Sequence, residues 1–529
     1  MKVVLTIPFI ALATVLSNLA MADTGSGRPN ILFIYADDLG YGDVACYNPE
    51  SKAPTPNIDR MAKEGIRFTD AHSPSTVCTP SRYSVMTGHM AFRLDYKGVF
   101  TGVQGPCLIT EDRLTLPGML RDQGYVTAMF GKWHIGMTFK DENGVPVYEL
   151  QEQLEAKHGR SGLGTKLVEL VDFSKRIEGG PLDRGFDTFF GTACCPTTDW
   201  LYAFIDGDRV PNAPTALLDR VKEGLPMHPY SKDNRIGYQS DDFDLQEVDM
   251  LFLEKSQAFL RDHAAKQSDQ PFFLFHSTQA VHLPSFPGRD FRGKTQAGPH
   301  GDFIFEFDTV VGELMDTLNA LNLSDNTLVI VSSDNGPEVG TSINMRNDHD
   351  HNGSRPWRGM KRDQWEAGHR VPFIVRWPGK IAAGSVSHQT ICQTDIMATC
   401  AAIVGAELPD DAAEDSFDIL PVLLGEDAGR PIRPFTLHQT IQLALAIRKG
   451  PWKFLDHQGS GGNNYSNERL APYALVDKAP DAPGQLYNLD SDPGETNNLY
   501  FENPEIVKEL KALLEQTKRS GRSRPLASR

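Results

Sequence analysis

Short apolar segments alternate with amphipathic ones along most of the chain. Residues 30–36 are almost entirely apolar, which is typical of a strand buried on both faces of a sheet. Similar segments predict strands at 125–130, 271–276, 327–332 and 371–377. Helical spacing of apolar residues predicts helices at 58–65, 246–266, 303–321 and 395–404. This order predicts an α/β fold with a large, mostly parallel sheet sandwiched by helices.

The pattern changes after residue 425. Two prolines, at 431 and 434, precede strand-like segments at 443–448 and 452–455, a turn-rich stretch at 459–464 and a helical segment at 504–518. We therefore expect a main domain over 23–425 and a smaller C-terminal α+β domain with an antiparallel sheet over 426–529. The basic residues 518–529 are expected to form a frayed end.

Residues 1–22 have the pattern of a secretory signal peptide. Lys2 precedes an apolar run at 3–16, and the small residues Ala20 and Ala22 flank Met21 as a cleavage site requires. We expect cleavage near Ala22 and a periplasmic or secreted product. Other apolar stretches are too short to cross a bilayer, so no membrane span is predicted.

Charge and cysteine content limit the partners. The net charge of −17 over 529 residues disfavours nucleic acid and anionic membranes, because both select basic surfaces. An anionic substrate must therefore be attracted by a local cationic pocket. Seven cysteines are an odd number for an exported protein, which indicates that one thiol has a role other than pairing.

The segment Cys78-Thr79-Pro80-Ser81-Arg82 places a thiol beside an anion-binding turn. Pro80 favours an extended Cys78-Thr79 and a helix that starts behind it. The first turn of a helix attracts anions, and arginine suits tetrahedral oxyanions. Two interpretations of Cys78 are open: half of a disulfide, or a reactive centre.

Acidic residues follow two of the predicted strands. Asp37 and Asp38 end the first strand, and Asp334 and Asn335 follow a later one. Ligands of open α/β sheets bind beyond the carboxyl ends of strands, so these side chains are expected to converge. Three carboxylates and an amide oxygen suit Ca²⁺, or less well Mg²⁺, rather than zinc. Turn formation and helix capping are the structural alternative.

Four basic side chains are candidates for charge stabilisation and proton transfer. Lys132 and His134 end an apolar run, and an extended chain would place both on one side. His282 follows a buried strand and is better placed for acid–base chemistry than His276, which we expect to be structural. Lys361 precedes another strand. An exposed lysine beside a packed tryptophan and histidine is the alternative for Lys132 and His134.

These residues belong to a larger pattern of motifs. Residues 78–82, with Met86-Thr87-Gly88 behind them, resemble the first sulfatase signature. Residues 124–134 resemble the second, although Phe130 is larger than the residue usual before Gly-Lys. Further likeness lies at 28–30, 55–59, 185–187, 333–336 and 366–372. The chain resembles the type I, formylglycine-dependent sulfatases of the alkaline-phosphatase-like fold, in the arylsulfatase and N-acetylgalactosamine-6-sulfatase group.

The resemblance implies a mechanism. Cys78 would be oxidised to formylglycine by a formylglycine-generating enzyme or an anaerobic sulfatase-maturating enzyme. Its hydrate would attack a sulfate ester and form a covalent sulfoenzyme. By position, the metal ligands for Ca²⁺ would be Asp37, Asp38, Cys78, Asp334 and Asn335. The other catalytic residues would be Arg82, Lys132, His134, His282 and Lys361.

The resemblance also implies a substrate class, a sulfated mono-, oligo- or polysaccharide with aryl sulfates as surrogates. Asp199 and Trp200 are candidates for sugar binding, since carboxylates accept from hydroxyls and aromatic rings stack on sugars. His349 and His351, in a hydrophilic loop, are further candidates. Ordinary packing is the alternative for this set. A phosphodiesterase or phosphonate monoester hydrolase of the same superfamily remains the rival enzyme, and a non-catalytic glycan-binding relative is a third hypothesis.

Overall fold

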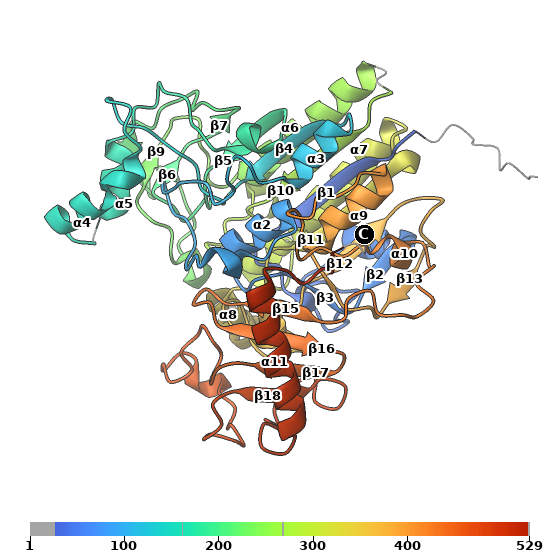
Figure 1. Ribbon diagram of the computed structural model, residues 1–529. Coiled ribbons are helices and arrows are strands. Elements are labelled where there is room, and N and C mark those ends of the chain that lie inside the picture. The colour runs from blue at the N-terminus through green and yellow to red at the C-terminus, as the bar shows by residue number, and fades with distance from the viewer. Residues whose placement is uncertain (1–26, 161, 267–268, 527–529) are drawn as a thin grey trace, which may run out of the picture.

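A nine-stranded sheet forms the centre of the molecule (Figure 1). The computed structural model describes residues 27–160, 162–266 and 269–526, so the predicted signal peptide at 1–22 lies outside the described residues. The sheet runs, in spatial order, through β13 (Ser385–Ser387), β2 (Ile66–Phe68), β12 (Phe373–Arg376), β11 (Thr327–Ser333), β1 (Asn30–Ala36), β10 (Phe272–Ser277), β4 (Val126–Lys132), β5 (Thr188–Thr192) and β7 (Ile205–Asp206).

The five central strands, from β11 to β5, are parallel to one another. Strand β12 is antiparallel to both of its neighbours, and β7 is antiparallel to β5. The predicted large, mostly parallel sheet is therefore confirmed.

Helices cover both faces of this sheet. Along β1, alternate side chains enter two different cores: Ile31, Phe33 and Tyr35 enter one, and Leu32 and Ile34 the other. The first core is closed by α2 (Cys78–Thr87), α3 (Leu116–Asp122) and α9 (Asp395–Val404). The second is closed by α1 (Pro56–Glu64), α6 (Val248–Ala265) and α7 (Gly298–Ala320). Burial on both faces explains why the strand is apolar throughout.

The helix at the cysteine motif starts earlier than predicted. Helix α2 begins at Cys78, after an extended Val77, so the expected extended Cys78-Thr79 is wrong. Pro80 is tolerated because the amide N–H groups of a helix's first turn have no partner within the helix. Cys78 therefore lies at the N-terminal end of the helix.

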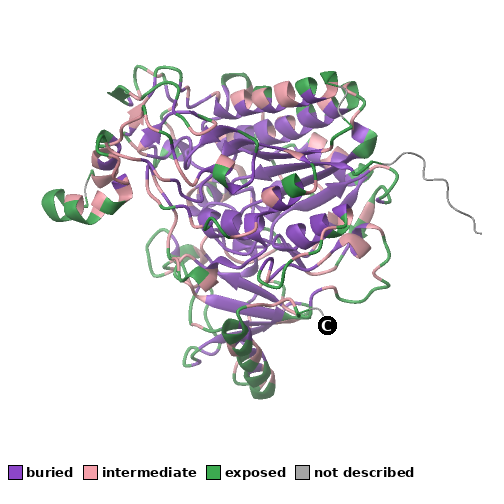
Figure 2. Cartoon of the chain, turned by 45° about the horizontal axis from the view of Figure 1, so that its top comes forward, coloured by how far each residue is buried: buried purple, intermediate pink, exposed green. Residues whose placement is uncertain are grey.

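A four-stranded antiparallel sheet follows in the C-terminal region, as predicted. It consists of β15 (Thr436–Gln439), β16 (Leu445–Lys449), β17 (Trp452–Leu455) and β18 (Gln485–Asn488), with α11 (Pro504–Ser520) packed against it. Figure 2 shows buried strands and an α11 that is exposed along its outer side. The domain boundary at 425 stays a prediction.

The chain beyond α11 returns to the main domain. The backbone N–H groups of Ser523 and Arg524 donate to the carbonyl oxygen of Glu414, at 3.0 and 2.9 Å. The prediction of a frayed end is therefore wrong for these residues, because their backbone finds partners on a neighbouring loop.

Shorter elements complete the fold. They are β3 (Ala71–His72), β6 (Leu201–Tyr202), β8 (Ala216–Leu217), β9 (Tyr238–Gln239), β14 (Ile391–Cys392), α4 (Gln151–His158), α5 (Leu163–Glu169), α8 (Val339–His349) and α10 (Leu420–Leu423). Within the described ranges, no helix has the length and apolarity needed to cross a membrane.

Candidate active site

The two acidic strand ends lie side by side. Strands β1 and β11 are parallel neighbours, and their last register pair is Ala36 with Ser333, so Asp37 and Asp38 emerge beside Asp334 and Asn335. The backbone N–H of Asp38 donates to Asp334 Oδ1 at 3.1 Å, and Asn335 Nδ2 donates to Asp38 Oδ1 at 2.7 Å. The four side chains are fully buried. The hydrogen bonds between these residues confirm the predicted convergence.

Three buried cations surround this acidic group. Lys132, the last residue of β4, donates to Asp37 Oδ2. Arg82 lies one turn into α2 and donates from Nε to Asp334 Oδ2 at 2.9 Å. Lys361 Nζ lies 2.7 Å from Asp38 Oδ1. Each carboxylate therefore has a cationic partner, which buried charges require.

The thiol of Cys78 opens onto a cavity of about 170 Å³. All seven cysteines are free, so a disulfide role for Cys78 finds no support. His134, Cys195, His282 and Lys361 also line this cavity. The structure thus brings the predicted catalytic side chains to the carboxyl end of the parallel sheet.

In each of the two histidines that line the cavity, His282 and His134, one ring nitrogen donates to a backbone carbonyl oxygen, which fixes the tautomer. His282 Nδ1 donates to the carbonyl oxygen of Leu283 at 2.5 Å, so the lone pair is on Nε2, which lies 3.6 Å from Asp38 Oδ2. His134 Nε2 donates to the carbonyl oxygen of Phe100 at 2.8 Å, which leaves the lone pair on Nδ1. His134 has a positive φ of 60°, so the strand does not continue from Lys132, and the two side chains are not placed by a strand repeat.

The charges of the site are strongly coupled. Burial raises the pKa of Asp38 to about 6 although Lys361 opposes this shift, and burial together with Asp37 raises the pKa of Asp334 to about 7. Burial also acts to raise the pKa of Asp37, but Lys132 and the other nearby cations hold it well below its usual range. Burial and the charge of Lys361 lower the pKa of His282 to about 3.

The donor atoms fit a hard divalent cation. Asp37 Oδ1 and Asn335 Oδ1 are buried oxygens without a hydrogen-bond donor among the described residues. Ligand atoms of Asp37, Cys78 and Asp334 lie within 4.8 Å of one another. Oxygen donors of this kind suit Ca²⁺ or Mg²⁺, and a bound cation would displace protons from the carboxylates.

The four predicted sugar-binding residues lie outside this cavity. Asp199 is buried and accepts from the backbone N–H of Trp200 at 2.7 Å, and Trp200 is half-buried beneath Arg235. His351 is buried and bonded to Asp43 at 2.7 Å, and His349 faces Tyr230. Their roles in binding stay predictions, although each has a partner within the protein.

Ser277 and Glu338 at the site have no counterpart in the sequence predictions, whereas Cys195 belongs to the stretch 192–202 that was expected to line a sugar subsite. Ser277 Oγ accepts from Arg82 at 2.6 Å and donates to the carbonyl oxygen of Lys132 at 2.9 Å. Cys195 Sγ lies 4.0 Å from His282 Nε2, and Glu338 Oε2 lies 3.7 Å from Lys361 Nζ. Ser277 ends β10 beside β4, so its position at a strand end was the only clue in the sequence.

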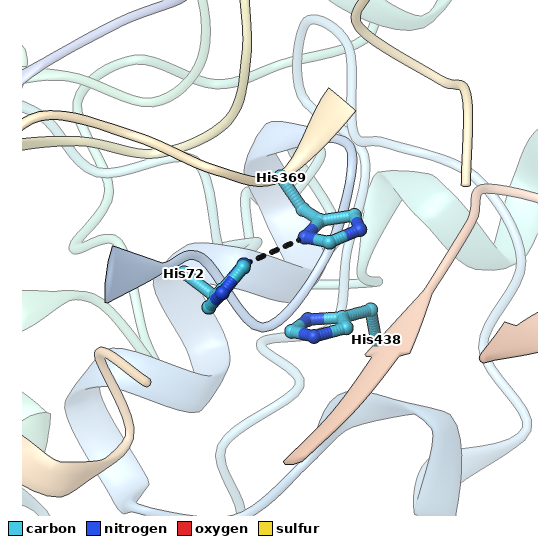
Figure 3. Close-up of side chains that lie close together, drawn as sticks. All are labelled: His72, His369 and His438. Carbon is cyan, nitrogen blue, oxygen red and sulfur yellow. Dashed lines mark hydrogen bonds between the residues drawn. The ribbon is translucent and has the colours of Figure 1, made fainter. Parts of the chain in front are cut away.

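A second cluster, of His72, His369 and His438, lies between the main sheet and the C-terminal sheet (Figure 3). The rings of His369 and His438 are stacked 3.9 Å apart, at 9° from parallel. Nitrogen lone pairs lie in the ring plane, so two stacked rings cannot direct them at one ion. Arg448 and Lys453 also lie next to the cluster. We therefore interpret it as a packed polar network rather than a metal centre.

Comparisons with known proteins agree with this geometry. The family model described as sulfatase matches residues 29–406. The chain is 33% identical to N-acetylgalactosamine-6-O-sulfatase of Bacteroides thetaiotaomicron, over 97% of this chain and 98% of that protein. It is 31% identical to human arylsulfatase A, over 92% of this chain and 87% of that protein.

Solved structures with a similar fold also include sulfatases. A Bacteroides thetaiotaomicron protein from work on the metabolism of multiple glycosaminoglycans has a TM-score of 0.77 and 31% identity, with 93% of this chain and 99% of that chain covered. A Pseudoalteromonas sulfatase has a TM-score of 0.68 and 26% identity, with 95% and 92% covered. The family match over most of the chain, together with these relatives, shows that the chain belongs to the sulfatase family and is a sulfuric ester hydrolase.

Proposed function

We propose that this enzyme removes sulfate from a sulfated carbohydrate, with a formylglycine derived from Cys78 and with Ca²⁺ as its cation. One observation carries the proposal: Cys78 begins α2 and lines the cavity, and its Sγ lies within 4.8 Å of carboxylate oxygens of Asp37 and Asp334. The name of the Bacteroides relative, a sulfatase of N-acetylgalactosamine, supports a sugar substrate.

Asp37, Asp38, Asp334 and Asn335 would hold the cation. When bound, a calcium ion supplies positive charge beside a sulfate oxygen, and the hydrated formylglycine supplies a hydroxyl nucleophile in place of the thiol. The unpaired buried oxygens of Asp37 and Asn335 support this assignment. Four of the proposed ligand atoms are carboxylate or amide oxygens, which favours calcium over zinc.

The remaining residues would handle charge and protons. Arg82, Lys132 and Lys361 stabilise negative charge on the sulfate oxygens, because they are buried and fixed by their carboxylate partners. Lys361 and His282 line the cavity. Burial acts to lower the pKa of Lys361, but Asp38 raises it above its usual value, so this ammonium keeps its protons and would protonate the departing alcohol oxygen. His282 is neutral with its lone pair on Nε2, so it would act as an acid only after Nε2 has taken up a proton. His134 has its lone pair on Nδ1 and would accept a proton from the nucleophile.

Two processing steps belong to the same proposal. Maturation of Cys78 would require a formylglycine-generating enzyme or an anaerobic sulfatase-maturating enzyme. Export to the periplasm or the medium, with cleavage near Ala22, would follow from the signal pattern at residues 1–22.

The first experiment measures the mass of the peptide that contains residue 78, in protein purified from its native host. We expect an aldehyde at this position, together with sulfate release from at least one sugar in a panel of defined sulfated sugars. A Cys78→Ala variant should release none. An unmodified thiol in active protein from the native host would contradict the proposal.

The rival phosphoryl chemistry is tested with esters of one leaving group. We expect 4-nitrophenyl sulfate to be hydrolysed faster than the matching phosphate monoester, phosphate diester and phosphonate monoester. Much faster hydrolysis of any phosphorus ester would favour the phosphodiesterase or phosphonate hydrolase hypothesis. Both anion types are tetrahedral, so the core residues alone do not separate them.

A further inference from the structure

Among the described residues, one cation at the active-site cavity forms no ion pair with a carboxylate. Arg235, Lys361 and Arg362 all line the cavity. Lys361 pairs with Asp38, and Arg362 makes two hydrogen bonds to Glu338, of 2.9 and 3.0 Å. Within the described parts of the chain, Arg235 forms no ion pair with a carboxylate within 4 Å, and its guanidinium lies over an aromatic ring.

Arg235 is held in place by its surroundings. Its guanidinium lies 5.0 Å from the centre of the Trp200 ring, a cation–π arrangement that fixes a planar group. The hydroxyl of Tyr202 donates to the backbone carbonyl oxygen of Arg235 at 2.7 Å, and Asn234 donates to that of Thr197 at 2.7 Å. The cation is therefore positioned before any ligand arrives, which lowers the cost of binding.

None of the three acidic residues considered at this site, Asp199, Asp233 and Glu338, forms an ion pair with Arg235 within 4 Å in the described parts of the chain. Asp199 uses one carboxylate oxygen to accept from two backbone N–H groups, of Gly102 and Trp200. Burial raises its pKa to about 7, although Arg235 opposes the shift. Asp233 also lines the cavity, but it is exposed and forms no ion pair within 4 Å in the described structure. Glu338 is already occupied by Arg362.

We infer that Arg235 binds a second anionic group of the substrate, a carboxylate or a second sulfate, while the sulfate to be removed lies beside Cys78. A guanidinium binds either group through two parallel hydrogen bonds. The molecule as a whole carries a charge of −17 and repels anions, so a doubly anionic substrate needs a local cation outside the catalytic group. This inference rests on the proposed function and adds a substrate class to it.

The interpretation also gives Trp200 a different role from stacking on a sugar. The guanidinium of Arg235 lies over its ring, and the backbone of Gly164 in α5 packs against the same indole. Trp200 would therefore act as a positioning residue for Arg235. The half-buried arginine, rather than the tryptophan, faces the cavity.

The test compares Arg235→Gln and Arg235→Lys with the formylglycine-containing wild type. Lys232→Gln is the matched control, because it removes the same charge from an exposed position of the same loop outside the cavity. The substrates are a monosulfated N-acetylhexosamine, the same sugar with a second sulfate, the same sugar linked to a uronic acid, and 4-nitrophenyl sulfate. Initial rates give kcat and KM for each.

We expect Arg235→Gln to lower kcat/KM about tenfold to a hundredfold for one of the doubly anionic sugars, the usual range for a lost charge-assisted hydrogen bond. The loss should appear mainly in KM and shrink at high salt. Rates on 4-nitrophenyl sulfate and the monosulfated sugar should stay nearly unchanged. Arg235→Lys should retain part of the preference, since lysine keeps the charge without the planar fork. The sugar that is affected identifies the second group as carboxylate or sulfate.

Other outcomes separate the two proposals. Equal loss on all four substrates, no loss on any, or the same loss in Lys232→Gln would overturn the role of Arg235 and leave sulfate ester hydrolysis intact. A mature wild type that releases sulfate from none of the sugars would overturn the proposed carbohydrate function, and the inference with it.

Discussion

Buried charges at the active site are tolerated because each has an opposite charge in contact. Arg82 is 1% exposed and lies 2.8 Å from Asp334, which is fully buried. Lys132 and Lys361 pair in the same way with Asp37 and Asp38. Such pairs contribute little net stability, because the gain from attraction is offset by desolvation of both charges. Removal of one partner is costly, because the other charge is left without compensation.

Arg82→Met should therefore destabilise the protein and abolish activity. We expect a loss of about 3–5 kcal/mol in the free energy of unfolding, measured by urea titration, because Asp334 loses its cation. The control is Arg60→Met, whose partner Asp316 lies at 2.9 Å with both side chains more than a third exposed. This surface pair should cost less than about 1 kcal/mol. Equal losses in the two variants would refute the argument from burial.

The positions of the active-site residues could be predicted from the sequence where those residues directly follow strands. Asp37 and Asp334 follow apolar strands, so the topology of a parallel sheet brings them together. Arg235 lies in a loop region without a periodic pattern, and no local feature marks it as lining the cavity. His351 resembles a surface ligand in sequence but is buried against Asp43, because side-chain direction in loops depends on tertiary contacts.

The sheet positions Lys132 through a close approach between two strands. Gly131 lies in β4 opposite Ser277 of β10, with a φ of 116°. A Cβ at Gly131 would lie 1.7 Å from the carbonyl oxygen of Ser277, a backbone atom that cannot move aside. The larger Phe130 just before it is compatible with this geometry, because its side chain packs on the other side, toward Phe259 of α6.

Gly131→Ala should consequently disrupt the active-site end of β4. We expect poorly folded protein or, in any folded fraction, loss of sulfate release, because Lys132 would shift with the strand. Gly144→Ala is the control, since Gly144 also has a positive φ, of 83°, but has no atom within 4 Å of the added Cβ. That variant should cost about 1–2 kcal/mol from backbone conformation alone and retain activity. Similar thermal midpoints for the two variants would contradict the steric explanation.

Elements were predicted best where hydrophobic periodicity is strong. Strand β1 and helix α9 have their predicted bounds, while α7 begins five residues before the predicted 303, with Pro299 in its first turn. Helix α2 was predicted behind Pro80, but its start was not, because all ten of its residues are buried and polar ones are included. The N-cap residue Val77 is extended and makes no side-chain cap hydrogen bond, so the sequence has no capping signal for a start at Cys78.

At the scale of the whole molecule, the C-terminal sheet supports the active site. Its first strand, β15, forms a bridge from Gln439 to Ser75, three residues before Cys78. Ile441 lines the cavity, and Asn463 donates to the backbone carbonyl oxygen of Lys361 at 2.8 Å. The main domain alone would therefore lack part of the cavity wall and one support for Lys361. We conclude that the smaller sheet is a structural part of the catalytic unit.

The histidine network between the two sheets should make this association sensitive to acid. Burial lowers the pKa of all three histidines, His72, His369 and His438, below the usual value. The carboxylates around them already form ion pairs with other cations and do not need a charged histidine. These carboxylates are Asp70, Glu366 and Glu495, and the cations are Arg370, Arg448 and Lys453. Below about pH 6.5 the unfolded chain binds protons that the folded chain excludes, so stability present at pH 7 is lost as the pH falls.

His438→Phe keeps a stacked ring but removes one titrating group, and should reduce the loss of unfolding free energy between pH 6.5 and 5 by roughly 2 kcal/mol. Thermal midpoints at both pH values measure this effect against His158→Phe, at the exposed end of α4. If His438→Phe and His158→Phe lose stability with acid as steeply as the wild type, the network is not the acid-sensitive element.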